Sequence, residues 1–117
     1  MVRYDIPKTV KGDTFDGVLF TVTLNSTALD LTNAVIKMDL RLIATDTPPV
    51  LSLTSVADAG LTILVPETDG KFKINEQVID INAGIYKYDV EITFPDNTVR
   101  TYFGGNWEII QDVTYDG

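Results

Sequence analysis

The stretch Ile85-Tyr86-Lys87-Tyr88-Asp89-Val90-Glu91-Ile92-Thr93-Phe94 decides the fold of this chain, because apolar and polar side chains alternate along its whole length. A period of two is typical of a β-strand that buries one face and exposes the other to water. The next four residues, Pro95-Asp96-Asn97-Thr98, predict a turn, since proline suits the second position of a type I turn. We expect this turn to place Phe94 opposite Val99, so that the apolar face of the hairpin continues with Val99, Thr101 and Phe103.

Gly104-Gly105 interrupts the second half of this hairpin and allows two interpretations. A two-residue turn at the glycines would bring Asn106 onto the face of Phe103. A continuous strand over residues 99–110 keeps Phe103 and Trp107 on the same apolar side. We therefore predict one bent strand, with a β-bulge at the glycines and with Trp107 buried in the core.

The rest of the chain repeats the alternation in shorter segments, separated by clusters of turn residues. Two segments, 18–24 and 35–42, would turn these side chains inward: Val18, Phe20, Val22, Leu24, Ile36, Met38, Leu40 and Leu42. Shorter strand candidates are 50–53, 61–65 and 71–74. Residues 75–83 fit neither period, and we expect a loop there with a helical turn capped by Asn75.

About seven to eight short strands in a chain of this length predict an all-β fold, an antiparallel immunoglobulin-like β-sandwich. The cysteine and tryptophan spacing of antibody domains is missing, and a small barrel is the alternative architecture. We expect a single domain over residues 1–117, with extended termini at about 1–11 and 111–117. These terminal segments would fray in an isolated domain.

The composition excludes most enzyme chemistry. The chain has no histidine and no cysteine, which removes Ser-His-Asp and Cys-His nucleophiles and almost every zinc site, and no cofactor is expected. The net charge of −8, with only 9 scattered lysines and arginines, argues against nucleic-acid binding. There is no signal-peptide pattern and no apolar run of about 20 residues that would span a bilayer, so we expect no membrane partner and synthesis in the cytoplasm.

Three candidate sites remain, each with a simpler structural interpretation. Asp39, Asp89 and Glu91 are the candidate acids of a glycoside hydrolase, but with Lys87 and Arg41 they also fit a solvated mixed-charge sheet face. The segments 13–17 and 67–70 offer carboxylates beside glycines for calcium, yet these are also ordinary turn residues. A sugar-binding surface would have to be built from the aromatic residues outside the expected core, which are Tyr4, Tyr102 and Tyr115.

An ordered set of short motifs carries a family resemblance. It comprises Lys11-Gly12-Asp13-Thr14-Phe15, Leu29-Asp30-Leu31-Thr32-Asn33-Ala34, Met38-Asp39-Leu40-Arg41, Gly60-Leu61-Thr62-Ile63, Gly84-Ile85-Tyr86-Lys87-Tyr88-Asp89-Val90-Glu91 and Asp112-Val113-Thr114. In this order the sequence resembles small β-domains of tailed phage and prophage structural modules. It is similar to the N-terminal domain of phage baseplate upper proteins and to free-standing virion proteins of about this size.

The resemblance implies a non-enzymatic structural component of a tailed phage particle, made in the bacterial cytoplasm and located in the virion. Its partners would be other virion proteins and further copies of itself in a symmetric assembly. The residues that we expect to make these contacts lie in the termini, where an extended segment can add a strand to a neighbour's sheet edge: Val2, Tyr4, Ile6, Pro7 and Tyr115. A carbohydrate-binding adhesion module is the second hypothesis, and a small carboxylate-based glycoside hydrolase is the third.

Overall fold

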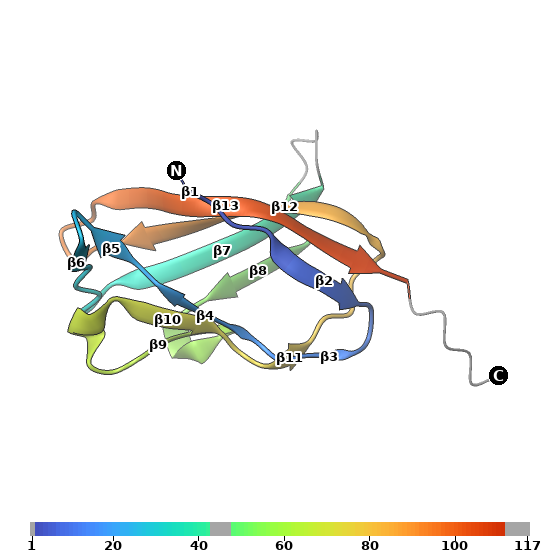
Figure 1. The fold of residues 1–117 in the computed structure, drawn as a ribbon, viewed down its shortest axis with the longest axis horizontal. Coiled ribbons are helices and arrows are strands. Elements are labelled where there is room, and N and C mark those ends of the chain that lie inside the picture. The colour runs from blue at the N-terminus through green and yellow to red at the C-terminus, as the bar shows by residue number, and fades with distance from the viewer. Residues whose placement is uncertain (1, 43–47, 112–117) are drawn as a thin grey trace.

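The computed structural model describes residues 2–42 and 48–111, which form two facing β-sheets and two short strand pairs (Figure 1). Two short 3-10 turns, η1 (Val56–Asp58) and η2 (Glu67–Asp69), lie in the connections. The strands are β1 (Val2–Arg3), β2 (Ile6–Val10), β3 (Thr14–Phe15), β4 (Val18–Thr21), β5 (Thr23–Leu24), β6 (Thr27–Ala28), β7 (Val35–Leu42), β8 (Leu51–Thr54), β9 (Leu61–Ile63), β10 (Lys71–Ile74), β11 (Gln77–Val78), β12 (Gly84–Thr93) and β13 (Val99–Ile110).

The order of the strands is that of an immunoglobulin-like sandwich. The larger sheet runs β1-β13-β12-β7-β8, with β2 also paired to β13, and the smaller sheet runs β4-β10-β9. Immunoglobulin domains place strands B, E and D in one sheet and C, F and G in the other. Here β4, β10 and β9 take the places of B, E and D, while β7, β12 and β13 take those of C, F and G. The predicted all-β immunoglobulin-like sandwich is therefore confirmed, with two separate sheets in place of a closed barrel.

A tyrosine at the start of β12 strengthens this assignment. The hydroxyl of Tyr86 donates a hydrogen bond of 2.6 Å to the backbone oxygen of Asn82, four residues upstream. This is the tyrosine corner of immunoglobulin-like domains, in which the second core cysteine of antibodies lies two residues further along strand F. Tyr88 occupies that position here and is buried in the core.

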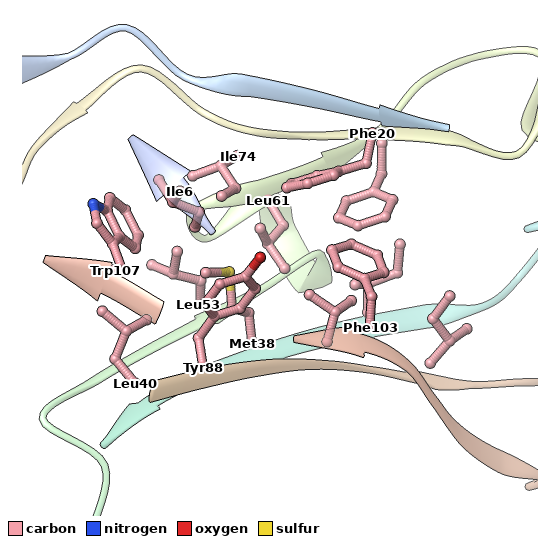
Figure 2. Close-up of a cluster of buried hydrophobic side chains, with 14 of the residues drawn as sticks. Ile6, Phe20, Met38, Leu40, Leu53, Leu61, Ile74, Tyr88, Phe103 and Trp107 are labelled. Atoms are coloured by element: carbon pink, nitrogen blue, oxygen red, sulfur yellow. The ribbon is translucent and has the colours of Figure 1, made fainter. Parts of the chain in front are cut away.

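The core lies between the two sheets, with inward side chains from both (Figure 2). Phe20 of β4 stacks on Phe72 of β10 at a ring-centroid distance of 5.2 Å and meets Phe103 of the facing sheet at 4.8 Å. Trp107 is fully buried, as predicted, and its ring lies 4.9 Å from that of Phe15. The inward residues of the long hairpin and of β7 are also buried: Tyr86, Tyr88, Val90, Ile92, Ile36, Met38 and Leu40.

The predicted strands at 35–42, 71–74 and 99–110 have the expected bounds, but the strand over 18–24 is interrupted. Val22 lies between β4 and β5 and donates its N–H to the oxygen of Gly70 at 2.8 Å. The chain then turns back at Asn25 and Ser26, both with positive φ, to form the β5–β6 hairpin. Leu24 is thus 54% exposed rather than buried, and Leu42 at the end of β7 is 42% exposed.

The register of the long hairpin differs from the prediction by one residue. Thr93, not Phe94, pairs with Val99, so Val99 and Thr101 face solvent. A bulge then follows, because Glu91 pairs with Thr101 while Val90 pairs with Phe103. The extra residue, Tyr102, returns Phe103 to the inner face. A slip of one residue inverts the two faces of a strand, and the bulge restores them. The predicted single strand is confirmed, but its bulge lies before the glycines.

Residues 75–83 contain no helical turn, contrary to the prediction. Gln77 and Val78 form β11, which pairs with β3, and Ile79 is 1% exposed. The side chain of Gln77 donates to the oxygen of Asn75 at 3.0 Å. This segment crosses from the smaller sheet to the larger one, and an extended chain covers that distance while burying Ile79 beneath it.

Candidate functional site: the N-terminal strand and the aromatic groove

The predicted carboxylates lie together on the outer face of the larger sheet. Asp39 of β7 is directly opposite Asp89 of β12, and Glu91 is opposite Lys37. Asp39 also approaches Arg41 at 3.7 Å, and Lys87 is opposite Arg41. The hollow between them has a volume of about 190 Å³. The face therefore carries three acids and three bases in adjacent rows, a mixed-charge surface in which the Asp39 side chain is only 18% exposed.

The two calcium candidates remain separate pieces of turn structure. Glu67 and Asp69 belong to η2, where the N–H of Asp69 donates to the oxygen of Pro66 at 3.0 Å. Asp13 and Asp16 flank β3 and line an open hollow of about 370 Å³ beside β2. Within the described ranges, no group of three or more acidic side chains is placed to hold a metal ion.

The N-terminal segment is docked on its own domain. β1 and β2 pair with β13 in parallel, with Val2 opposite Phe103 and Ile6 opposite Trp107. The segment thereby covers the edge of the larger sheet (Figure 1). The prediction that it would fray is therefore wrong for residues 2–10, because each half of the segment has backbone partners on β13.

Between β1 and β2 the chain crosses β13 at Tyr4 and Asp5, and two hydrogen bonds hold the backbone of Tyr4 there. The N–H of Tyr4 donates to the oxygen of Gly104 at 2.8 Å, and the hydroxyl of Tyr88 donates to the oxygen of Tyr4. Burial raises the pKa of the Tyr88 phenol above its ordinary value, and the neighbouring Tyr4 and Asp5 raise it further. The hydroxyl thus stays protonated and remains a donor at all physiological pH values.

Gly105 makes this crossing possible. A Cβ atom at this position would overlap the backbone oxygen of Tyr4 and lie 2.8 Å from Oδ1 of Asp5. The next N–H, that of Asn106, donates to the same carboxylate at 2.9 Å. This hydrogen bond lowers the pKa of Asp5, and the nearby Arg3 lowers it further. The glycine that was predicted to form a bulge is therefore the point where the N-terminal strand lies against β13.

The second half of the segment is anchored in the core. Ile6 is 4% exposed, and Thr9 accepts a hydrogen bond of 2.9 Å at Oγ1 from Nε1 of Trp107. Pro7 is exposed in β2, which pairs only with β13 in the described structure, as expected for a proline on an edge strand. Of the other predicted interaction residues, Val2 lies in β1, Tyr4 is 40% exposed, and Tyr115 lies outside the described residues.

An aromatic groove opens beside the crossing, between the edges of the two sheets. Its volume is about 240 Å³, and the ring of Tyr4 meets that of Phe20 edge to face at a centroid distance of 5.5 Å. No charged residue lines it, although the chain has a net charge of −8. The full lining is Tyr4, Phe20, Thr21, Val22, Thr23, Tyr102 and Phe103. Sequence reasoning identified two of these as surface aromatics but missed the groove, because only the docked N-terminal strand brings Tyr4 to Phe20.

β4 forms the other border of this groove, and its outer edge is unpaired. β10 is the only strand that pairs with β4 in the described part of the chain. In immunoglobulin sheets with the order A-B-E-D, strand A occupies the place beside B. Here the N-terminal strand pairs with β13 instead, so the place beside β4 is vacant. On the opposite side of the sandwich the two sheets are tied together, since Thr54 and Gly60 form a parallel bridge between them.

No family model and no curated protein sequence matches this chain. Among solved structures, the chain is similar to extracellular domains 3–5 of Drosophila OTK, with a TM-score of 0.35 and 16% sequence identity. That match covers 90% of this chain and 33% of the matched chain, so this chain spans about a third of the length of those three domains. The immunoglobulin-like assignment rests on the strand order and the tyrosine corner. In the described ranges there is no helix of the length and apolarity that crossing a bilayer requires.

Proposed function

We propose that this chain is a non-enzymatic structural component of a tailed phage particle and acts through contacts with other virion proteins and with further copies of itself. The single observation that carries the assembly role is the edge of β4. Folded monomers usually protect such edges with charged residues, proline, bulges or a covering segment. The residues of β4, Val18-Leu19-Phe20-Thr21, include no charge and no proline, and Leu19 is 57% exposed. An edge without charge or proline and with an exposed leucine favours a protein partner that adds a strand.

The ordered motifs that resemble phage structural modules support the particle as the place of that assembly. Lys11-Gly12-Asp13-Thr14-Phe15 leads from β2 into β3, and Met38-Asp39-Leu40-Arg41 lies in β7. Both motifs thus form parts of the sandwich itself, which fits a resemblance that extends over a whole domain.

The particle assignment is tested by tagging the gene in its source genome and purifying particles on a density gradient. Quantitative mass spectrometry should find the chain at a constant number of copies per particle. A chain that stays with the soluble proteins at every stage of lysis would contradict the proposal. Capsid or tail genes beside its own gene would agree with the first outcome.

The aromatic groove gives a specific observation in favour of the second hypothesis, a carbohydrate-binding adhesion module. The groove is lined by the aromatic residues Tyr4 and Tyr102 and by the hydroxyl-bearing residues Thr21 and Thr23, without any charge. Neutral sugars are bound by such combinations of aromatic and hydroxyl groups. A glycan array probed with the full chain and with Tyr102→Ala tests this hypothesis. Binding of a defined glycan that Tyr102→Ala abolishes would favour adhesion over assembly.

A further inference from the structure

We infer that the vacant place beside β4 is filled by residues 111–117 of a second copy of this chain, which add to the smaller sheet as a strand. The inference rests on the proposed assembly role and names the partner for it. The added strand would extend the sheet from β4-β10-β9 to four strands and lie over the aromatic groove. Its backbone would pair with the outer edge of β4, as in other cases of strand addition.

The sequence of this segment fits the two sides of the vacant place. In Gln111-Asp112-Val113-Thr114-Tyr115-Asp116-Gly117, Val113 and Tyr115 alternate with Asp112, Thr114 and Asp116. In an extended strand the two apolar side chains share one face and the two acids share the other. The apolar face matches the uncharged lining of the groove.

The acidic face matches the outer surface of the smaller sheet. Lys71 is opposite Thr21 and Lys73 is opposite Leu19, so both lysines lie on this surface one strand away from the vacant place. Both are exposed, and neither forms an ion pair within the described residues. A strand that carries Asp112 and Asp116 on this side would bring opposite charges close to them, which selects the orientation of its faces.

The donor has to be a second copy because of the geometry of β13. The groove is lined by Tyr102 and Phe103 near the beginning of this strand, whereas residue 111 follows its far end (Figure 1). From Phe103 to Ile110 the strand extends over roughly 23 Å, and seven residues in extended conformation reach about the same distance. Residues 111–117 of the same chain would therefore need their whole length to get back to the groove, and none would be left to pair with β4. A contact in which each copy donates at one end and accepts at another is head to tail, and it repeats around a ring or along a helix.

The absence of cysteine from the chain allows a direct test by cross-linking. Full-length Thr114→Cys is mixed with full-length Thr21→Cys and treated with a short bis-maleimide, and the yield of mixed dimer is measured. Thr21 is exposed on the outer face of β4, so this substitution leaves the core intact. Ser52→Cys is the matched control acceptor, because Ser52 is an exposed residue of β8 in the other sheet. Thr23→Cys provides a second acceptor position at the groove.

We expect the Thr21→Cys mixture to give a several-fold higher yield of mixed dimer than the Ser52→Cys mixture. Adding Val113→Asp and Tyr115→Asp to the donor chain should remove this excess. Equal yields from Thr21→Cys, Thr23→Cys and Ser52→Cys would overturn the inference, as would an excess that persists when the donor chain carries Val113→Asp and Tyr115→Asp. The proposed function is tested separately, by the presence of the chain in purified particles. If the chain is found in particles but gives no excess of mixed dimer, the proposed function stands and the inferred partner segment is wrong.

Discussion

At the scale of single residues, Tyr88 has two roles. It takes the position of a core cysteine of antibody domains, and its hydroxyl holds the N-terminal strand at the backbone oxygen of Tyr4. Tyr88→Phe removes the donor to the backbone oxygen of Tyr4 and leaves that oxygen without this partner. We expect the free energy of unfolding to fall by about 1–3 kcal/mol at pH 7, measured by urea denaturation. An unchanged stability would mean that the hydrogen bond from Tyr88 adds nothing measurable to the other contacts that hold Tyr4 at the crossing.

The same residue predicts a pH dependence. The pKa of Tyr88 is raised in the folded chain, so the folded state favours the protonated phenol more strongly than the unfolded chain does. Its contribution to stability is therefore complete below the unfolded value of about 10 and is lost as the pH rises through the interval above it. Urea denaturation between about pH 9 and pH 11 should show a steeper loss of stability for the native chain than for Tyr88→Phe. If stability falls equally with pH in the native chain and in Tyr88→Phe, groups other than Tyr88 cause the loss of stability at high pH.

Gly105 predicts a second residue-scale effect. Gly105→Ala places a methyl group against the backbone oxygen of Tyr4 and 2.8 Å from Oδ1 of Asp5, so the N-terminal strand has to move. We expect a loss of about 1–3 kcal/mol in thermal or urea unfolding. Gly84→Ala is the matched control, because the nearest atoms to its Cβ lie at an ordinary 3.9 Å. Similar losses for the two variants would show that Gly105 is not special.

Thr9 and Trp107 give a third test inside the core. Thr9→Val keeps the shape of the side chain but removes the acceptor of the indole N–H, which is then buried without a partner. We expect a loss of about 1–3 kcal/mol and a tryptophan emission maximum that stays at the short wavelengths of an apolar site. An emission maximum typical of water in the folded native chain would contradict the burial of Trp107 itself.

At the scale of the elements, the N-terminal strand is part of the sandwich. Deleting residues 1–8 exposes the edge of β13, removes the buried side chain of Ile6 and leaves Tyr88 without its acceptor. We expect the free energy of unfolding to fall by at least about 3 kcal/mol, with a lower midpoint in thermal denaturation. Ile6→Ala tests the same contact without shortening the chain and should cost about 2–5 kcal/mol. An unchanged midpoint for both variants would restore the view of this segment as a free arm.

The strands that could be predicted are those whose local pattern and long-range pairing agree. The alternation of apolar and polar residues alone predicted β7, β10, β12 and β13, because each of these strands buries one face against the other sheet. Phe103 and Trp107 lie on the same face only if the strand is continuous, and this was enough to reject a turn at Gly104-Gly105. The bulge at Tyr102 was not predictable in the same way, since it depends on where the Pro95 turn closes the hairpin.

The candidate site could be predicted only in part. Tyr4, Ile6 and Pro7 were recognised as important, but their docking on β13 depends on contacts across about a hundred residues of sequence, such as those of Asp5 with Asn106 and of Thr9 with Trp107. The signal that could have revealed it was Gly104-Gly105, a place in a strand where another backbone can approach closely. The vacant place beside β4 follows from this docking and has no signature of its own in the sequence.

At the scale of the whole molecule, the two sides of the sandwich differ: on one side backbone hydrogen bonds join the two sheets, and on the other, open side the aromatic groove separates them. Bonds between Thr54 and the residues Ala59 and Gly60 join the sheets on the first side, while β4 and the N-terminal strand remain separated by the aromatic groove on the second. The lining of the groove on the open side is uncharged although the chain has a net charge of −8, so a partner that enters the groove meets no charged side chain there. This asymmetry directs association to one side of the domain.

The measurement that tests this account most directly is amide hydrogen exchange of the chain, free in solution and within purified particles. We predict that peptides covering residues 6–10 are protected in both states, because β2 is paired within its own domain. Peptides covering residues 18–21 should exchange faster in the free chain and become protected in the particle, where a partner strand covers β4. Protection of residues 6–10 that appears only in the particle, together with unchanged exchange of residues 18–21, would contradict the account and assign assembly to the N-terminal segment.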